Sequence, residues 1–234
     1  MNSEHIFKVR ERAVLHDKKW QKLRRRSRLF RYIPFVDFIL VAGSMATGEV
    51  RPSSDFDIIV AAQQGRMFTS RFFLIVALDF FRWRRKNLDH GEASADTICP
   101  NHFVTEARYK LSPPHGHYWR ELYQRLVPLY GDSVKIARFY TANASWMGER
   151  AYEDDMRHRF RNAAGITRFF EDFLSGSIGD GFERLLRRAQ EKRIHEKILP
   201  HAGYKPRLHI SDAELELHLD TKRIEVFEGI SAKY

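Results

Sequence analysis

The residues best suited to chemistry lie in the stretch FILVAGSMATGEVRPSSDFDIIV, residues 38–60. An apolar run ends at Gly43 and Ser44, and the chain returns through Asp55 and Asp57, one residue apart, into a second apolar run. Because side chains alternate along a strand, the two aspartates point to one face. Two carboxylates held this close repel each other and need a counter-charge. The pattern predicts a site for a divalent cation that prefers oxygen ligands, Mg²⁺ or Mn²⁺.

The Gly-Ser pair adds a way to hold phosphate beside such an ion. Glycine lets the backbone approach a phosphate closely, and the Ser44 amide and hydroxyl can bond phosphate oxygens at a helix start. With the metal, they would hold a nucleoside triphosphate (NTP) for in-line attack by an acceptor hydroxyl. The alternative is a structural turn with an N-capping serine and a solvated acidic pair. That alternative explains Asp-x-Asp alone better than it explains the whole string between two apolar strands.

The string GSMATGEVRPSSDFDIIV resembles the signature of the DNA polymerase β-like nucleotidyltransferase superfamily, in which Gly-Ser and a helical turn precede Asp-x-Asp. The resemblance covers about residues 36–105. It implies a mixed sheet flanked by helices, a magnesium ion, an NTP donor and release of pyrophosphate. Matched residue by residue, Gly43 and Ser44 correspond to the phosphate-binding pair, and Asp55 and Asp57 to the metal-binding pair.

The superfamily usually places a third acid on a neighbouring strand, as general base and metal ligand. Here the expected strand is ADTICPNHFVTE, and Asp96 near its start is the first choice for catalytic residue and metal ligand. Glu106 and Asn101 on the same segment, and Asp89 and Glu92 in the preceding loop, are alternatives. If none of them serves, the site binds nucleotide and metal but catalyses poorly.

Other motifs are weaker. His115 and His117 form a His-x-His pair without an obvious third ligand. Cys99 is expected to be a small buried hydrophobe, and Asn143 and Trp146 are expected to cap and pin a helix. The chain has neither a GxxxxGK[ST] phosphate loop nor a GxSxG elbow.

Composition limits the setting in which this chemistry would occur. The chain has 234 residues, with 40 Lys+Arg against 30 Asp+Glu and a formal net charge of +10. This balance favours acidic partners such as nucleic acid or nucleoside phosphates. A single cysteine excludes an internal disulfide framework and fits a reducing cytoplasm. The charged N-terminus lacks a signal-peptide core, and the apolar segment 72–81 is too short to cross a bilayer. We therefore expect a soluble, cytoplasmic protein without membrane association.

The periodicity predicts an α/β (α+β) fold, a small mixed sheet flanked by helices and followed by a mainly helical region. The division is expected near residue 112, with a nucleotidyltransferase domain over 1–112 and a C-terminal region over 113–234. Pro100 indicates an edge strand or a bulge. Helices are predicted over 4–31, 66–86, 118–130, 149–174 and 179–198, strands over 35–43, 55–62 and 95–105, and a small hairpin over 207–219.

Three acceptors fit the rest of the chain. RNA is favoured by the net charge, by the basic run 23–28 and by a basic helix near the C-terminus. A protein or small-molecule acceptor, and a nucleotide-binding module with little catalysis, are the alternatives. The preferred NTP and the oligomeric state stay open. The predicted nucleic-acid-binding residues on the basic helix are Arg184, Arg187, Arg188, Lys192 and Arg193.

Overall fold

The structure, a computed structural model, describes residues 3–85, 95–113, 115–151, 157, 162–219, 221 and 224. The loop alternatives Asp89 and Glu92 therefore lie outside the described residues, as does part of the helix predicted over 149–174. The predicted mixed α/β fold is confirmed for the described part of the chain.

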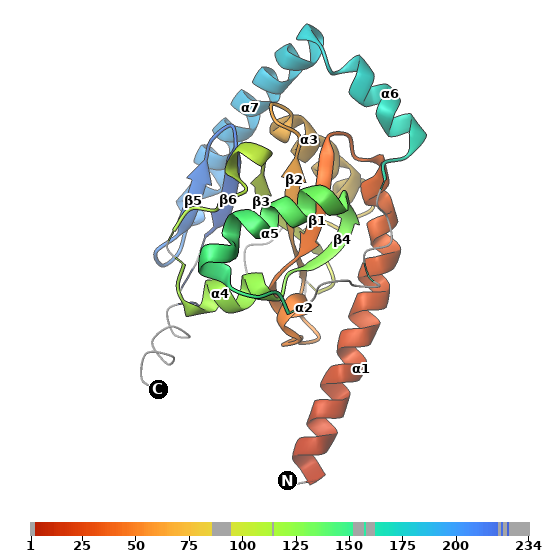
Figure 1. Cartoon of the computed structure of the whole chain (residues 1–234), viewed down its shortest axis with the longest axis vertical. Helices are drawn as coiled ribbons and strands as arrows, with labels where there is room; N and C mark the ends of the chain where they lie inside the picture. The colour runs from red at the N-terminus through yellow and green to blue at the C-terminus, as the bar shows by residue number, and fades with distance from the viewer. Residues whose placement is uncertain are drawn as a thin grey trace.

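Six strands of the described residues form one mixed sheet, in the order β4-β1-β2-β3-β6-β5 (Figure 1). Strands β2 and β3 run parallel, and the other neighbouring pairs are antiparallel. Strands from both halves of the sequence therefore share one sheet. The strands are β1 Val36–Val41, β2 Phe56–Ala62, β3 Ile98–Val104, β4 Val127–Gly131, β5 Arg207–Ile210 and β6 Glu214–His218.

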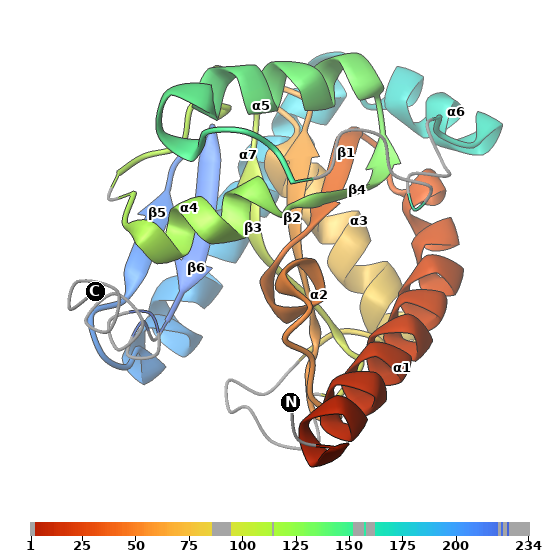
Figure 2. The ribbon, with the colours of Figure 1, turned by 60° about the horizontal axis from the view of Figure 1, so that its bottom comes forward.

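Helices cover both faces of this sheet (Figures 1 and 2). Helices α3 and α7 pack on one face, while α4 and α5 pack on the other. No helix of the described ranges is both long and apolar enough to cross a membrane. The α-helices are α1 Ser3–Arg26, α2 Gly43–Thr47, α3 Met67–Phe80, α4 His117–Gln124, α5 Ser133–Met147, α6 Gly165–Phe173 and α7 Ser177–Lys197, with 3-10 turns at Ser27–Tyr32, Glu106–Arg108 and Leu199–His201.

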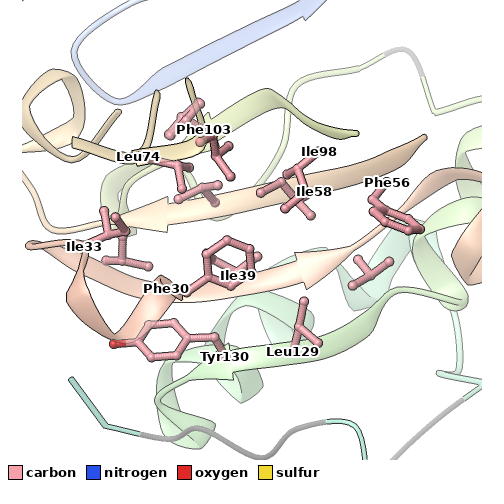
Figure 3. Packing of buried hydrophobic residues seen from close by; sticks show 14 of the residues in the cluster. Phe30, Ile33, Ile39, Phe56, Ile58, Leu74, Ile98, Phe103, Leu129 and Tyr130 are labelled. Atoms are coloured by element: carbon pink, nitrogen blue, oxygen red, sulfur yellow. The ribbon is translucent and has the colours of Figure 1, made fainter. Parts of the chain in front are cut away.

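The hydrophobic core has two layers, one on each face of the sheet. The alternating residues of β2 divide between them: Ile58 packs with the α3 side, and Ile59 packs with the α4 and α5 side. Strands that are covered on both faces are apolar at nearly every position. This explains why the second half of β1 is a continuous apolar run. Figure 3 shows the layer on the α3 side, which includes Phe30, Ile39, Ile58, Leu74 and Phe103.

The helix predicted over 118–130 is wrong in its second half. Helix α4 ends at Gln124, and β4 pairs with β1 at the edge of the sheet. Pro128 cannot continue a helix, and proline is tolerated on an edge strand. Within this segment, only the residues of α4 have helical spacing. Long-range pairing with β1 decided the conformation of the rest.

Strand β3 is interior, and the irregularity expected at Pro100 is a bulge. Pairing with β2 passes from Pro100 to His102, so Asn101 is the residue without a β2 partner. The predicted C-terminal hairpin is confirmed as β5 and β6, and β6 joins the far side of β3 along His102–Val104. The hairpin therefore completes the main sheet.

Candidate active site

Gly43 and the carboxylate of Asp57 lie against each other at the start of α2. The chain leaves β1 with a backbone bond from Ala42 N to Asp57 O of 2.9 Å. Gly43 then adopts φ +60°, and a Cβ built on it would lie 2.2 Å from Asp57 Oδ2. Glycine is required here for two reasons, the left-handed backbone and the absence of space for a side chain. The structure thus brings the predicted phosphate-binding pair to the predicted metal-binding pair.

Asp55 and Asp57 share one face of the sheet with a third group, the thiol of Cys99. One ligand atom from each of the three lies within 4.8 Å of the others. The parallel register places Cys99 directly beside Asp57. The sequence alone predicts a small buried apolar role for Cys99. Only the pairing of β2 with β3 shows that its side chain faces the carboxylates. Burial, and then the charges of Asp57 and Asp55, raise the pKa of the Cys99 thiol well above its usual value.

The electrostatics of the pair depend on a second residue that sequence reasoning missed, Arg85. Its Nη1 atom donates to Asp55 Oδ2 at 2.7 Å. Burial, and then the neighbouring Asp55 charge, raise the pKa of Asp57 to about 7, although Arg85 lowers it in part. Asp55 therefore has a protein counter-charge, whereas Asp57 is the carboxylate whose negative charge is least compensated.

Asp96 does not lie with these carboxylates. Its side chain binds Lys19 at 2.7 Å and also Lys22, and Lys19 donates to the carbonyl of Ser54 at 2.7 Å. The Lys19 ammonium is 5.7 Å from the ring of Phe56, which points to the face opposite the aspartate pair. Through these contacts, Asp96 and Lys19 connect α1 to the turn before β2.

The other candidates for the third acid are also elsewhere. Glu106 follows the end of β3 and pairs with Arg138 at 2.8 Å on the exposed surface. Asn101 occupies the β3 bulge. Among the described Asp, Glu, His and Cys residues, only Cys99 forms a three-member group with Asp55 and Asp57.

Helix α4 adds a tyrosine to the site. Burial, and then the charges of Asp57 and Glu49, raise the pKa of Tyr118 to about 12, so its phenol stays protonated near the carboxylates. The preceding predicted His-x-His pair does not form a metal group among the described residues: His115 stacks on Trp146 with ring centroids 3.9 Å apart. Asn143 lies inside α5 and pins the loop before α4 by accepting from Leu111 N.

The predicted nucleic-acid-binding residues lie on α7, on the other face of the sheet. The helix packs against the α3 layer through Leu186 and Ile194. Arg187 is engaged by Glu191 at 2.9 Å and by Asp212. The structure therefore does not bring this helix to the aspartate pair. The residues of the predicted set that are exposed are Arg184, Arg188, Lys192 and Arg193.

The donors of the site fit a divalent ion in part. Two carboxylates on one face are the oxygen ligands that Mg²⁺ and Mn²⁺ take. The adjacent thiol of Cys99 is a soft ligand that suits a softer ion than Mg²⁺. Compared with known proteins, the chain matches no protein-family model, no curated protein and no solved structure.

Proposed function

We propose that this chain is a metal-dependent nucleotidyltransferase that moves a nucleoside monophosphate from an NTP to an acceptor hydroxyl. The observation that supports the proposal best is the contact between Gly43 and Asp57, with Asp55 on the same face. Because Gly43 has no side chain and adopts a left-handed backbone, the main chain approaches the carboxylate pair closely in this turn. This close approach is the arrangement needed to hold a triphosphate against a carboxylate-bound cation.

In this proposal Asp55 and Asp57 hold the cation, Mg²⁺ or Mn²⁺, and the backbone at Gly43 and Ser44 receives the phosphates. The bound ion would neutralise charge on the triphosphate. The acceptor oxygen bonds to the α-phosphorus as the bond to the β-phosphate oxygen breaks; the hydroxyl proton passes to water and pyrophosphate leaves. Arg85, beside Asp55, is placed to offset phosphate charge.

RNA is the acceptor that the net charge of +10 favours. An RNA bound to α7 would have to pass around an edge of the sheet, because that helix covers the opposite face. The basic end of α1 also packs on that face, but it reaches the strand end that carries Asp55: Lys22 and Arg26 both contact Asp96, whose amide donates to Ser54 O in the turn before Asp55. We therefore include the α1 cations in the proposed RNA surface.

A second function, nucleotide binding without efficient transfer, is favoured by one specific observation. The β3 position beside Asp57 carries Cys99, where the resemblance implies a third carboxylate. A neutral thiol binds a hard cation less well than a carboxylate does. Because the pKa of Cys99 is raised, its thiol stays protonated and does not readily accept a further proton.

Binding and transfer should be measured separately to distinguish the two functions. Mn²⁺ binding is followed by electron paramagnetic resonance with and without ATP, and labelled NTPs are offered with RNA, protein and small-molecule pools. We expect Asp57→Asn and Asp55→Asn to lose Mn²⁺ binding and all labelling, while the exposed Asp17→Asn on α1 retains both. Binding without labelling of any pool supports the second function, and undiminished Mn²⁺ binding in both site variants contradicts both.

A further inference from the structure

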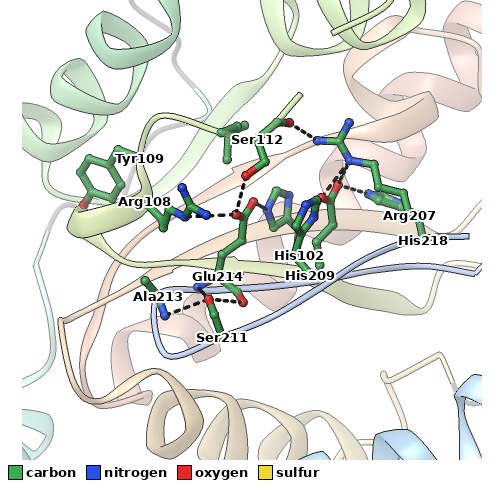
Figure 4. Close-up of polar contacts among 12 residues, drawn as sticks. His102, Arg108, Tyr109, Ser112, Arg207, His209, Ser211, Ala213, Glu214 and His218 are labelled. Carbon is green, nitrogen blue, oxygen red and sulfur yellow. Dashed lines mark hydrogen bonds and ion pairs between the residues drawn. The ribbon is translucent and has the colours of Figure 1, made fainter. Parts of the chain in front are cut away.

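A second group of metal-ligating side chains lies farther along the same sheet face, where His102 pairs with Ile59, two positions beyond Asp57. His102 comes from β3, and Glu216 and His218 come from β6; His102 and Glu216 are direct cross-strand partners. A ligand atom from each of the three lies within 4.8 Å of the others. Figure 4 shows these strands bringing His102, His218 and the neighbouring Glu214 into one polar cluster.

Oxygen Oε1 of Glu216 is the unexplained atom of this cluster. Glu216 is fully buried, and Oε1 accepts no hydrogen bond of acceptable geometry. Arg207 Nε is 2.9 Å from both oxygens, but its hydrogen bond goes to Oε2, which also contacts His209 Nδ1 at 2.9 Å. A buried carboxylate oxygen without a hydrogen bond is costly. The nearest histidine nitrogen is His218 Nε2, 3.2 Å from Oε1.

That separation matches two ligands of one metal ion. Tetrahedral zinc with ligand bonds of 2.0–2.1 Å places neighbouring ligand atoms about 3.3 Å apart. The rings of His102 and His218 are nearly perpendicular, with centroids 6.5 Å apart, as for two imidazoles that approach one point from different strands.

The buried charges also leave room for a cation. Glu214 and Glu216 are 1% and 0% exposed. Arg207, whose side chain is 9% exposed, is the arginine close to these carboxylates. Arg108 is half exposed and lies 3.8 Å from Glu214, so it compensates their charge less. Two buried carboxylates beside one close arginine are unfavourable unless further positive charge compensates them.

We propose that His102, Glu216 and His218 form a binding site for one divalent transition-metal ion of the zinc type. Two imidazoles and one carboxylate are a common zinc ligand set, and three protein ligands leave a fourth position. The site is distinct from the proposed nucleotide site, and its occupation would fasten the β5–β6 hairpin to β3.

Neighbouring residues can orient these ligands. The hydroxyl of Tyr123 lies 3.2 Å from His102 Nδ1, and partners of this kind fix the ring of a metal-bound histidine. His102 Nε2 lies 3.3 Å from Glu214 Oε1, so an ion would take the place of that contact. Arg207 has contacts besides Glu216: it donates to Ser112 O at 2.9 Å and lies 4.5 Å from the centre of the Trp119 ring. It can therefore keep its place when Oε1 binds an ion.

The test uses the full chain, stripped with a chelator and titrated with Zn²⁺ or Co²⁺ alone. We expect one ion per chain by mass spectrometry, and a visible Co²⁺ spectrum of a four-coordinate ion without a thiolate charge-transfer band. Cys99→Ser should leave this spectrum unchanged. His218→Gln is chosen because the side chain is 21% exposed at a strand end. It should weaken binding at least about tenfold, while the exposed His195→Gln on α7 should not.

Two results would overturn the proposal. Absence of stoichiometric Zn²⁺ or Co²⁺ binding by the folded wild type would show that the histidines and glutamates form a metal-free structural network. Disappearance of the cobalt spectrum in Cys99→Ser, with His218→Gln unchanged, would assign the ion to the group around Asp57. The Cys99→Ser spectrum distinguishes the two sites even if a histidine variant does not fold.

Discussion

The carboxylate of Asp57 fills the space in which a side chain at position 43 would lie. A Cβ on Gly43 would be 2.2 Å from Asp57 Oδ2, and Gly43 itself has φ +60°. This contact joins the end of β1 to the start of β2 on the face that carries Asp55 and Cys99. It also provides a substitution that tests the site without removing a charged group.

Gly43→Ala should damage both the fold and the site. The left-handed backbone costs about 1–2 kcal/mol with alanine, and the new methyl group must displace the Asp57 carboxylate. We expect Mn²⁺ binding to disappear and any transfer to fall by about 100-fold, as a displacement of about 1 Å can cause. Gly65→Ala is the matched control, because Gly65 has φ +74° with no atom within 4 Å of its Cβ direction. Equal Mn²⁺ binding by the two variants would contradict a functional role for the contact.

Asp96→Asn should affect stability more than binding. Burial alone would raise the pKa of Asp96, but Lys19 and Lys22 outweigh this effect and lower it. A lowered carboxyl pKa contributes stability above the unfolded-state pKa, and this contribution disappears as the pH falls through the folded-state pKa. The variant should therefore be less stable by about 2 kcal/mol at pH 7. The difference should shrink below about pH 4.

Denaturant unfolding at neutral and acid pH measures this difference, and Mn²⁺ titration of the folded variant measures the site. Glu106→Gln is the control, because its ion pair with Arg138 is exposed and is expected to contribute little. A stable Asp96→Asn chain that binds NTP but transfers nothing would instead restore Asp96 as the third catalytic acid.

Cys99→Asp tests the position beside Asp57. A third carboxylate should strengthen Mn²⁺ binding, because more charged ligands raise the affinity for a hard cation. It should also lower the stability of the metal-free chain through repulsion with Asp55 and Asp57. If a missing acid limits transfer, the variant should label its acceptor faster than the wild type. Cys99→Ala, which adds no charge, should do neither. Weaker Mn²⁺ binding by folded Cys99→Asp would show that this position does not face the ion.

The α7 cations offer a test of the RNA proposal. Replacing Arg184, Arg188 and Lys192 with Gln should flatten the log-log dependence of RNA affinity on salt, by about 0.7 for each single-strand phosphate that the helix no longer neutralises. Arg187→Gln should have a smaller effect, because Glu191 and Asp212 already engage that side chain. Filter binding over a salt series measures the slopes. If the triple variant and the wild type have equal slopes, α7 does not contact the RNA, and the α1 cations become the next residues to replace.

Local physics made part of the site predictable from the sequence. Alternation along a strand places Asp55 and Asp57 on one face whatever surrounds them. A glycine between an apolar strand and a short helix indicates a left-handed turn or a close approach, and Gly43 has both. The hairpin over 207–219 was equally predictable, because its alternation is confined to a short segment.

Only the tertiary structure decided which third residue joins the aspartates. Asp96 and Cys99 stand three residues apart on one segment, and the parallel register of β2 and β3 places Cys99 beside Asp57. A shift of one residue reverses the faces of a strand, and the information that sets the register lies in distant packing. Arg85 likewise reaches Asp55 only because the tertiary fold brings the two residues together. The ion pair of Asp96 with Lys19 depends on how α1 packs, which no local pattern records.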